Sequence, residues 1–370
     1  MKLCCYFNYP PLYRKAIYQA IDRTFDTQFY FGEEVEDGNA SGIAKIDFSI
    51  FRKRPIEFKN KTFLHRFGWR TKSWNLAFKN YDAFIITGDF MFSYIPLLLF
   101  TRLMGKRVYG WGHGLKTLGK GFRLLNIFFY KFLNGYFTYS EGGKNRLGEL
   151  GIDTSKVHVI YNSLSEGIDE NVVRGLKSDI YSEHFGNTLP ILIFIGRLTP
   201  QKKLDKLIYT LQKLNEGGTG CNLVFVGTGS ESDKLSSLTE ELGIDDHVWF
   251  FGECYDENTN GELLYNADLC ISPGNVGLTA LHAMSYGLPV ISHSNFETQM
   301  PEYETIVPGL TGDLFEEGNM DDLFVKVKDW ITNNISHRAQ IRNNCFNMIN
   351  GNWNSGNQLK ILQSVLKANV

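Results

Sequence analysis

The sequence has no apolar run long enough to cross a lipid bilayer. The longest such run, FMFSYIPLLLF at residues 90–100, is too short, because a membrane-spanning helix takes about 20 residues. The first ten residues, MKLCCYFNYP, also lack the basic-then-apolar order of a signal peptide. From these two absences we expect a protein that neither crosses a membrane nor carries a secretion signal.

Cysteine is scarce and shows no spacing typical of a metal centre or a redox site. None of the six cysteines belongs to a CxxC pair, and most lie in apolar, strand-like segments. Buried free thiols in a reducing compartment fit this pattern better than disulfides do. Internal repeats and low-complexity tracts are absent as well. We expect a cytoplasmic protein, free or attached to the inner face of the cell membrane.

Length and charge both indicate two domains. A chain of 370 residues exceeds the usual size of a single domain. Residues 1–165 hold 24 Lys and Arg against 13 Asp and Glu, whereas the remaining residues hold 14 against 27. The basic first half favours an anionic partner. We place domains at residues 1–165 and 166–350, followed by a C-terminal helix within 351–370.

Strand-like and helix-like segments alternate in two blocks. Several strands are continuous apolar runs, as expected for strands buried on both faces of a parallel sheet. The pattern predicts α/β architecture with two Rossmann-like, doubly wound domains that bind ligands beyond the carboxyl ends of their strands. The predicted strands are 3–8, 83–88, 107–112, 135–140 and 157–162, then 190–196, 222–227, 248–252, 269–273, 289–293 and 311–315.

Two loops of the second block carry features of a phosphate site. Arg197 and Lys202 follow a predicted strand, and two cations at a strand end suit a diphosphate; a solvated charge pair is the alternative. In SPGNVGLTALHAMSYGLPVI (272–291), a glycine-bearing turn leads into a helix whose first amides can bind phosphate. Asn275 or Thr279 could also simply cap that helix.

A third segment, VFVGTGSES, resembles a dinucleotide-binding fingerprint only weakly. Ser232 stands where the third glycine belongs, and the segment lies in the middle of the chain. A tight strand-to-helix turn is the favoured interpretation.

Seven segments, taken in order, resemble the retaining glycosyltransferases of the GT-B fold, specifically glycosyltransferase family 4. The resemblance covers residues 135–163 and 190–331 and is looser over 1–134, as expected for an acceptor-binding domain. The segments are GYFTYSEGGKNRLGELGIDTSKVHVIYNS, FIGRLTPQKKLDKLI, LVFVGTGSESDKL, ELGIDDHVWFFGE, LYNADLCISPG, ALHAMSYGLPVI and MPEYETIVPGLTGDLF.

The resemblance implies a GT-B fold, in which two Rossmann-like domains face a cleft. The first domain binds the acceptor and the second a UDP- or GDP-sugar, while the final helix (355–369) crosses back to the first. The nucleotide sugar is a substrate, so no cofactor is implied. Because no DxD-like motif occurs in the expected place, we also expect no metal.

Site residues follow from the same resemblance, position by position. Arg197 and Lys202 would hold the donor diphosphate and support its departure, and His113 would contact the reacting sugar. The wider set is Val276, Gly277, Leu278 and Thr279 around the phosphates; Phe251, Gly252, Tyr255 and His282 around the nucleoside; Asn275 at the sugar; and Tyr13 and Arg14 at the acceptor or the cleft.

The chain departs from the family at two positions. The family carries two glutamates with seven residues between them, of which the first touches sugar hydroxyls and the second ribose hydroxyls. Here these positions hold Gly274 and His282. His282 can still bond a ribose hydroxyl or a phosphate, although a lone helical histidine is more often structural. Gly274 offers no side chain, so sugar recognition falls to Asn275, the backbone or another residue.

Two stretches of the first block suit an anionic, lipid-linked acceptor. Residues 51–74 hold nine basic or histidine side chains, six aromatic ones and one acid. Residues 120–137 mix Lys and Arg with an apolar face. A peripheral membrane contact and a polyprenyl-diphosphate-linked glycan fit both, although a core helix against the sheet is the favoured explanation of the second stretch. Nucleic acid is disfavoured, because no RNA-binding motif accompanies these residues.

Three function classes remain open at this point. The leading one is a glycosyltransferase that builds a surface polysaccharide or a similar glycan. A nucleotide-sugar 2-epimerase of the same fold would need no acceptor chemistry. A non-catalytic member would keep nucleotide binding but not turnover.

Overall fold

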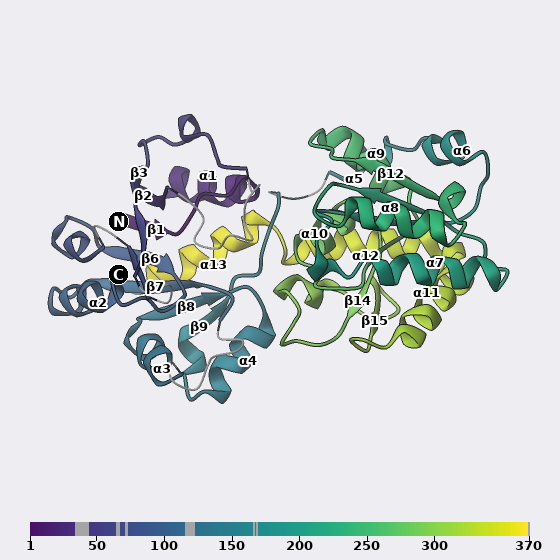
Figure 1. Ribbon diagram of the computed structural model, residues 1–370. Helices are drawn as coiled ribbons and strands as arrows, with labels where there is room; N and C mark the ends of the chain where they lie inside the picture. Colours follow the sequence, from purple (N-terminus) through teal and green to yellow (C-terminus); the bar gives the residue numbers. More distant parts are fainter. Residues whose placement is uncertain are drawn as a thin grey trace. The chain divides into compact units, whose positions relative to one another are not determined.

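The computed structural model describes residues 1–33, 44–63, 67–70, 73–114, 123–165, 167 and 169–368. The chain forms two compact units (Figure 1). Unit 1 contains residues 1–166 and 354–370, and unit 2 contains residues 167–353. Each unit is described separately below.

Unit 1 is built on a seven-stranded parallel sheet. Its strand order is β3-β2-β1-β6-β7-β8-β9. The strands of this sheet are β1 (Lys2–Phe7), β2 (Asp26–Gly32), β3 (Ile56–Phe58), β6 (Ala83–Thr87), β7 (Arg107–Gly112), β8 (Gly135–Thr138) and β9 (Val157–Val159). A separate antiparallel pair joins β4 (Asn60–Phe63) to β5 (Phe67–Arg70).

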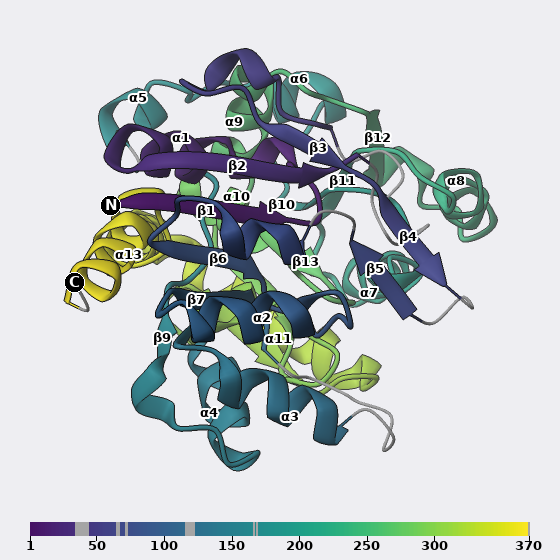
Figure 2. The ribbon, with the colours of Figure 1, turned by 90° about the vertical axis from the view of Figure 1, so that its left-hand side faces the viewer.

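Helices cover both faces of this sheet (Figures 1 and 2). They are α1 (Lys15–Thr24), α2 (Tyr94–Leu103), α3 (Arg123–Phe132), α4 (Glu141–Glu149) and α13 (Ser355–Ala368). One core joins α1 and α13 to alternate residues of β1, such as Leu3 and Cys5. The other joins α2 and α3 to the intervening residues, such as Cys4 and Tyr6. Leu362 and Leu366 of α13 are fully buried, so the end of the chain is part of unit 1.

Unit 2 holds a six-stranded parallel sheet with the order β12-β11-β10-β13-β14-β15. The strands are β10 (Ile191–Ile195), β11 (Asn222–Val226), β12 (Val248–Gly252), β13 (Leu269–Ser272), β14 (Val290–His293) and β15 (Gly312–Phe315). Every residue of β10, β11, β13 and β14 is buried, as the continuous apolar runs predict.

Of the helices of unit 2, α7, α8, α9 and α10 connect successive strands from β10 to β14, whereas α5 and α6 precede the sheet and α11 and α12 follow it. Helix α7 contacts α8 and α11, α10 contacts α12, and α9 contacts α5 and α6. Their bounds are α5 (Glu170–Arg174), α6 (Ile180–Phe185), α7 (Asp205–Glu216), α8 (Ser232–Glu241), α9 (Glu257–Asn266), α10 (Leu278–Ser285), α11 (Met320–Asn334) and α12 (Arg338–Gly351). None of the described helices in either unit is long and apolar enough to span a bilayer.

Candidate functional site

The candidate site lies where the strand order of unit 2 reverses. The chain runs from β10 outward to β11 and β12 and then returns to form β13 on the other side of β10. The loops after β10 and β13 therefore leave the same edge of the sheet from neighbouring strands and run in opposite directions. Open α/β sheets bind ligands at such a point. Arg197 belongs to the first loop and residues 274–277 to the second.

Glycines pack the loop after β10 against the loop after β11. A Cβ added at Gly227 would lie 2.0 Å from the carbonyl oxygen of Gly196, and one at Gly229 would lie 2.2 Å from that of Leu198. The glycines of VFVGTGS thus allow two loops to pack closely, which supports the tight-turn interpretation over a dinucleotide fingerprint. Arg197 follows Gly196 directly and is exposed.

Lys202 joins the two loops of the site. Its Nζ donates to the backbone oxygen of Asn275 at 2.6 Å and to the Oδ1 of Asn275 at 2.9 Å. In return, the amide of Gly274 donates to the carbonyl oxygen of Lys202 at 2.9 Å. Burial lowers the pKa of Lys202 to about 8; the Glu302 carboxylate opposes this shift and the Arg197 guanidinium adds to it. Two cationic side chains are therefore held at one edge of the sheet.

Gly274 cannot carry a side chain in this loop. An added Cβ would lie 1.9 Å from the carbonyl oxygen of Gln201 and 2.8 Å from the Cα of Lys202. Both neighbours are backbone, so neither can move aside cheaply. Asn275, predicted to contact the sugar, accepts a hydrogen bond from Lys202 at its Oδ1.

A buried glutamine holds the same loop from the other side. Gln299 is 1% exposed, and its Oε1 accepts from the amide of Val276 at 2.9 Å. Its Nε2 donates to Ser292 Oγ at 2.7 Å and to the carbonyl oxygen of His293 at 2.9 Å. Val276 was expected to offer its amide to a phosphate. In the structure this amide is already bonded, so Val276 supports the loop instead.

Helix α10 begins with open amides. Gly277 has φ 54° and ψ −147° at the N-cap, and no side chain caps the helix. Thr279 Oγ1 donates to the carbonyl oxygen of Ile195 at 2.9 Å, so neither Asn275 nor Thr279 acts as a cap, contrary to the simpler alternative. Within the described part of the chain, the amides of Gly277, Leu278 and Thr279 donate to no backbone oxygen, as expected for a first helical turn.

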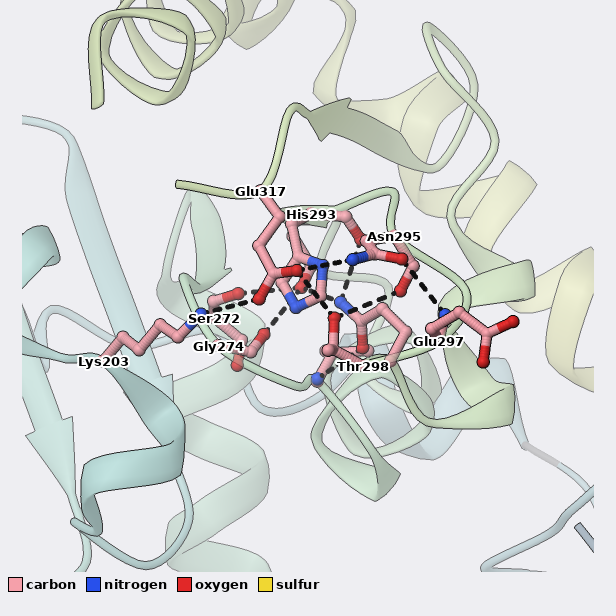
Figure 3. Close-up of polar contacts among 11 residues, drawn as sticks. Lys203, Ser272, Gly274, His293, Asn295, Glu297, Thr298 and Glu317 are labelled. Carbon is pink, nitrogen blue, oxygen red and sulfur yellow. Dashed lines mark hydrogen bonds and ion pairs between the residues drawn. The ribbon is translucent and has the colours of Figure 1, made fainter. Parts of the chain in front are cut away.

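A second polar cluster borders the site (Figure 3). Glu317 pairs with Lys203 Nζ at 2.7 Å and accepts from Thr298 Oγ1 at 2.8 Å and from Asn295 Nδ2 at 2.7 Å. The hydrogen bond from Lys203 first, and then those from Thr298 and Asn295, lower the pKa of Glu317 to about 2. Lys203 has φ 51°. This cluster therefore ties the chain after Lys202 to the loops that follow β14 and β15.

The predicted nucleoside residues lie at the end of β12, just after it, and on α10. Gly252 ends β12 with φ 89°, and its carbonyl oxygen accepts from the amide of Gly227 at 2.7 Å. The neighbouring Phe251 ring contacts Trp249. The Tyr255 side chain is 78% exposed. His282 is half-buried and bonds Glu257 through Nε2 at 2.8 Å.

Unit 1 gathers its own predicted residues at the carboxyl edge of its sheet. His113 follows β7, and its ring centroid lies 4.9 Å from that of Tyr139. Arg14 donates to the Tyr139 hydroxyl, and its guanidinium lies 5.6 Å from the Trp111 ring centroid and 6.0 Å from that of Tyr13. Tyr13, Arg14 and His113 thus surround one aromatic cluster.

Parts of the two basic stretches fall outside the described residues, namely 64–66, 71–72 and 120–122. The described part of the second stretch includes α3, which buries Asn126, Phe129 and Tyr130. Among the residues that the structure describes, no group of three or more His, Cys, Asp or Glu side chains could hold a metal ion.

Comparison with known proteins finds one family model that matches part of this chain. The model of the family "Glycosyl transferases group 1" matches residues 179–348. Lipopolysaccharide 1,6-galactosyltransferase of Salmonella typhimurium is 26% identical over 209 residues, covering 55% of this chain and 54% of that protein. A GDP-mannose-dependent α-(1-6)-phosphatidylinositol dimannoside mannosyltransferase of Mycobacterium tuberculosis is 32% identical over 30% of this chain and 29% of its own. The chain thus aligns with about half or less of these relatives.

Solved structures extend the similarity to the whole fold. The lipopolysaccharide outer core galactosyltransferase WaaB matches with a TM-score of 0.72 and 18% identity, over 100% of both chains. HepE of Anabaena, in complex with UDP, matches with a TM-score of 0.74 and 16% identity, again over 100% of both. At these identities the likeness shows the fold alone, and that fold is GT-B. The model of the group 1 glycosyltransferases thus matches a part of unit 2, and the chain as a whole has the two-domain GT-B fold.

Proposed function

We propose that this protein transfers a sugar from a nucleoside diphosphate sugar to a glycan or a lipid-linked glycan during surface polysaccharide synthesis. One observation carries the proposal: two cationic side chains, Arg197 and Lys202, and the open amides that begin α10 meet at the switch point of one sheet. This arrangement is suited to a diphosphate. The solved HepE complexes contain UDP or UDP-glucose, which supports a nucleotide sugar as the donor.

The role proposed for these groups depends on where negative charge develops during sugar transfer. As the sugar leaves the diphosphate, negative charge grows on the phosphate oxygens, and cations or amides fixed beforehand stabilise it. We assign this role to Arg197, Lys202 and the amides of residues 277–279. We propose retention of configuration, with the departing phosphate itself accepting the proton of the acceptor. His113 would then bond a sugar hydroxyl, and Tyr13 and Arg14 would contact the acceptor.

The acceptor side of the proposal includes a membrane surface. Helices α2 and α3 are neighbours, because the guanidinium of Arg102 lies 5.5 Å from the Phe132 ring centroid. Both expose apolar side chains: Leu103 is 82% exposed and Leu124 is 78% exposed. Arg102 and Lys131 add positive charge near them. An apolar surface flanked by cations fits a peripheral contact with anionic lipid.

A location in the cytoplasm is part of the same proposal. All six cysteines lie among the described residues, none forms a disulfide, and five are buried. Free buried thiols are typical of a reducing compartment.

The test is turnover with a panel of UDP-, GDP- and CDP-sugars, with and without glycan and polyprenyl-diphosphate-linked acceptors. We expect release of nucleoside diphosphate that depends on the acceptor. A sugar isomer formed from the donor alone would support the epimerase instead. Nucleotide binding without any release across the panel would support the non-catalytic alternative.

A further inference from the structure

Two side chains of α10 hold one carboxylate of α9. His282 Nε2 lies 2.8 Å from the Oε1 of Glu257, and the Tyr286 hydroxyl donates to the same oxygen at 2.7 Å. His282 and Tyr286 are one helical turn apart, and their ring centroids lie 5.8 Å from each other. Glu257 is the first residue of α9. The carboxylate is thus fixed in position by a neighbouring helix.

His282, which bonds this carboxylate, lies one helical turn beyond the open amides of α10. His282 is three residues after Thr279 and four after Leu278, so all three belong to the same face of the helix. One turn advances about 5.4 Å, which is on the order of the distance from a diphosphate to the ribose attached to it. Helix α10 itself, LTALHAMS, contains no carboxylate. The carboxylate that His282 and Tyr286 bond is supplied by α9.

We infer that Glu257 accepts hydrogen bonds from the ribose hydroxyls of the donor nucleotide, and that His282 and Tyr286 are positioning residues for it. The inference rests on the proposed function, because it requires a nucleoside diphosphate in the site. A ribose presents two adjacent hydroxyl donors, and an ionised carboxylate is an acceptor with four lone pairs. A carboxylate on the ribose hydroxyls is a recurring arrangement in Rossmann-like domains.

Charge and exposure agree with this role. Burial raises the pKa of Glu257, but hydrogen bonds from His282, Tyr286 and Asn260 outweigh that effect and hold the pKa below its ordinary value. The carboxyl group is therefore ionised at neutral pH. Its side chain is 64% exposed, whereas that of His282 is 21% exposed. The histidine is thus the supporting member of the pair, and Glu257 is the member that reaches solvent.

The test compares ribose with a sugar that lacks both hydroxyls. UDP, GDP, CDP and ADP are first titrated calorimetrically into the full chain, and the tightest is paired with its 2′,3′-dideoxy counterpart. Glu257→Gln should weaken binding of the ribonucleotide about 10-fold to 100-fold, the usual range for a hydrogen bond to a charged group. Binding of the dideoxy nucleotide should change less than about twofold, because it has no hydroxyl to lose.

Control variants distinguish the positioning of Glu257 from a general loss of structure. Glu262→Gln changes a carboxylate on the same helix and should leave both affinities unchanged. His282→Ala and Tyr286→Phe should each lower the preference for ribose over dideoxyribose, but less than Glu257→Gln does. His282→Gln keeps a donor and should recover part of that preference.

The outcomes distinguish this inference from the proposed function. If no nucleoside diphosphate binds the unaltered protein, the proposed function fails and the inference fails with it. If the nucleotide binds but Glu257→Gln weakens both probes equally, or neither, the carboxylate is structural and only the inference is overturned.

Discussion

The ammonium of Lys202 bonds both the backbone oxygen and the side-chain oxygen of Asn275, at 2.6 and 2.9 Å. This single side chain therefore connects the loop after β10 to the loop after β13. Bonds within the protein thus hold the two loops together at the edge proposed to receive a diphosphate. Such preorganisation favours binding and transition-state stabilisation, because less ordering remains to be done.

Nucleotide affinity should depend on the protonation of Lys202. Its pKa is about 8 in the free protein, against an ordinary value near 10.4, and a bound diphosphate will raise it by stabilising the ammonium. Affinity should be constant between about pH 7 and 8 and then fall by up to about tenfold per pH unit above that. Calorimetry from pH 7 to 9.5 measures this. Lys202→Arg, which stays charged throughout, should remove the decline; a decline of equal size in that variant would assign it to another group.

Gly274 should tolerate no side chain. Gly274→Ala places a Cβ against the backbone of Gln201 and Lys202, and we expect a loss of about 1–3 kcal/mol in the free energy of unfolding. Gly351→Ala is the matched control, because a Cβ there meets nothing within 4 Å, and should change stability by less than about 1 kcal/mol. Urea denaturation compares the two. Equal stability of both variants would show that the loop accommodates a side chain after all.

Gln299 should stabilise the loop after β13 through its hydrogen bonds. Gln299→Met keeps the length of the side chain but leaves the buried Val276 amide without its acceptor. An unsatisfied buried group costs about 1–3 kcal/mol, and nucleotide affinity should fall as the loop loosens. Gln212→Met removes a surface hydrogen bond on α7 and should cost less than about 0.5 kcal/mol. Denaturation and calorimetry on both variants provide the comparison. An unchanged nucleotide affinity in Gln299→Met would separate this residue from the site.

Glu317 should contribute stability that depends on pH. Its pKa is lowered to about 2 from an ordinary value near 4.3. For a carboxylate with a lowered pKa, the stabilisation is complete above the unfolded value and is lost as pH falls toward the folded value. The difference in unfolding free energy between the unaltered protein and Glu317→Gln should therefore be largest near pH 6 and shrink as pH falls below about 4.3. Denaturation curves at about pH 6, 4 and 3 measure it. A difference that stays constant over this range would mean that folding does not lower the pKa of Glu317.

Periodicity predicted the buried strands well, because burial on both faces produces continuous apolar runs. All eleven predicted strands are present. Those at 107–112 and 248–252 have the predicted bounds, and the others differ by one to three residues at one or both ends; for example, the run at 190–196 forms β10 at Ile191–Ile195. The prediction did not include β2, whose residues DTQFYFG mix polar and aromatic side chains. Nor did it include β3, which has only three residues and lies at the sheet edge.

The site was predictable only in part. Arg197, Lys202 and the glycine-bearing turn stand out, because they follow predicted strands of a parallel sheet, where such sheets bind ligands. Gln299 and Glu257 were not predicted, because a lone Gln or Glu gives no local signal. Their importance arises from contacts with residues more than twenty positions away, such as Val276 and His282. Only the fold brings these partners together.

The most direct test of the account is nucleoside diphosphate binding to Arg197→Ala and Lys202→Ala, measured by calorimetry beside Lys213→Ala. Lys213 belongs to an exposed ion pair with Asp321 on the surface of unit 2. We predict that Lys213→Ala binds as the unaltered protein does, while the other two lose about 10-fold to 100-fold or more in affinity and keep their fold. Full affinity in both Arg197→Ala and Lys202→Ala would contradict a diphosphate site at the start of α10.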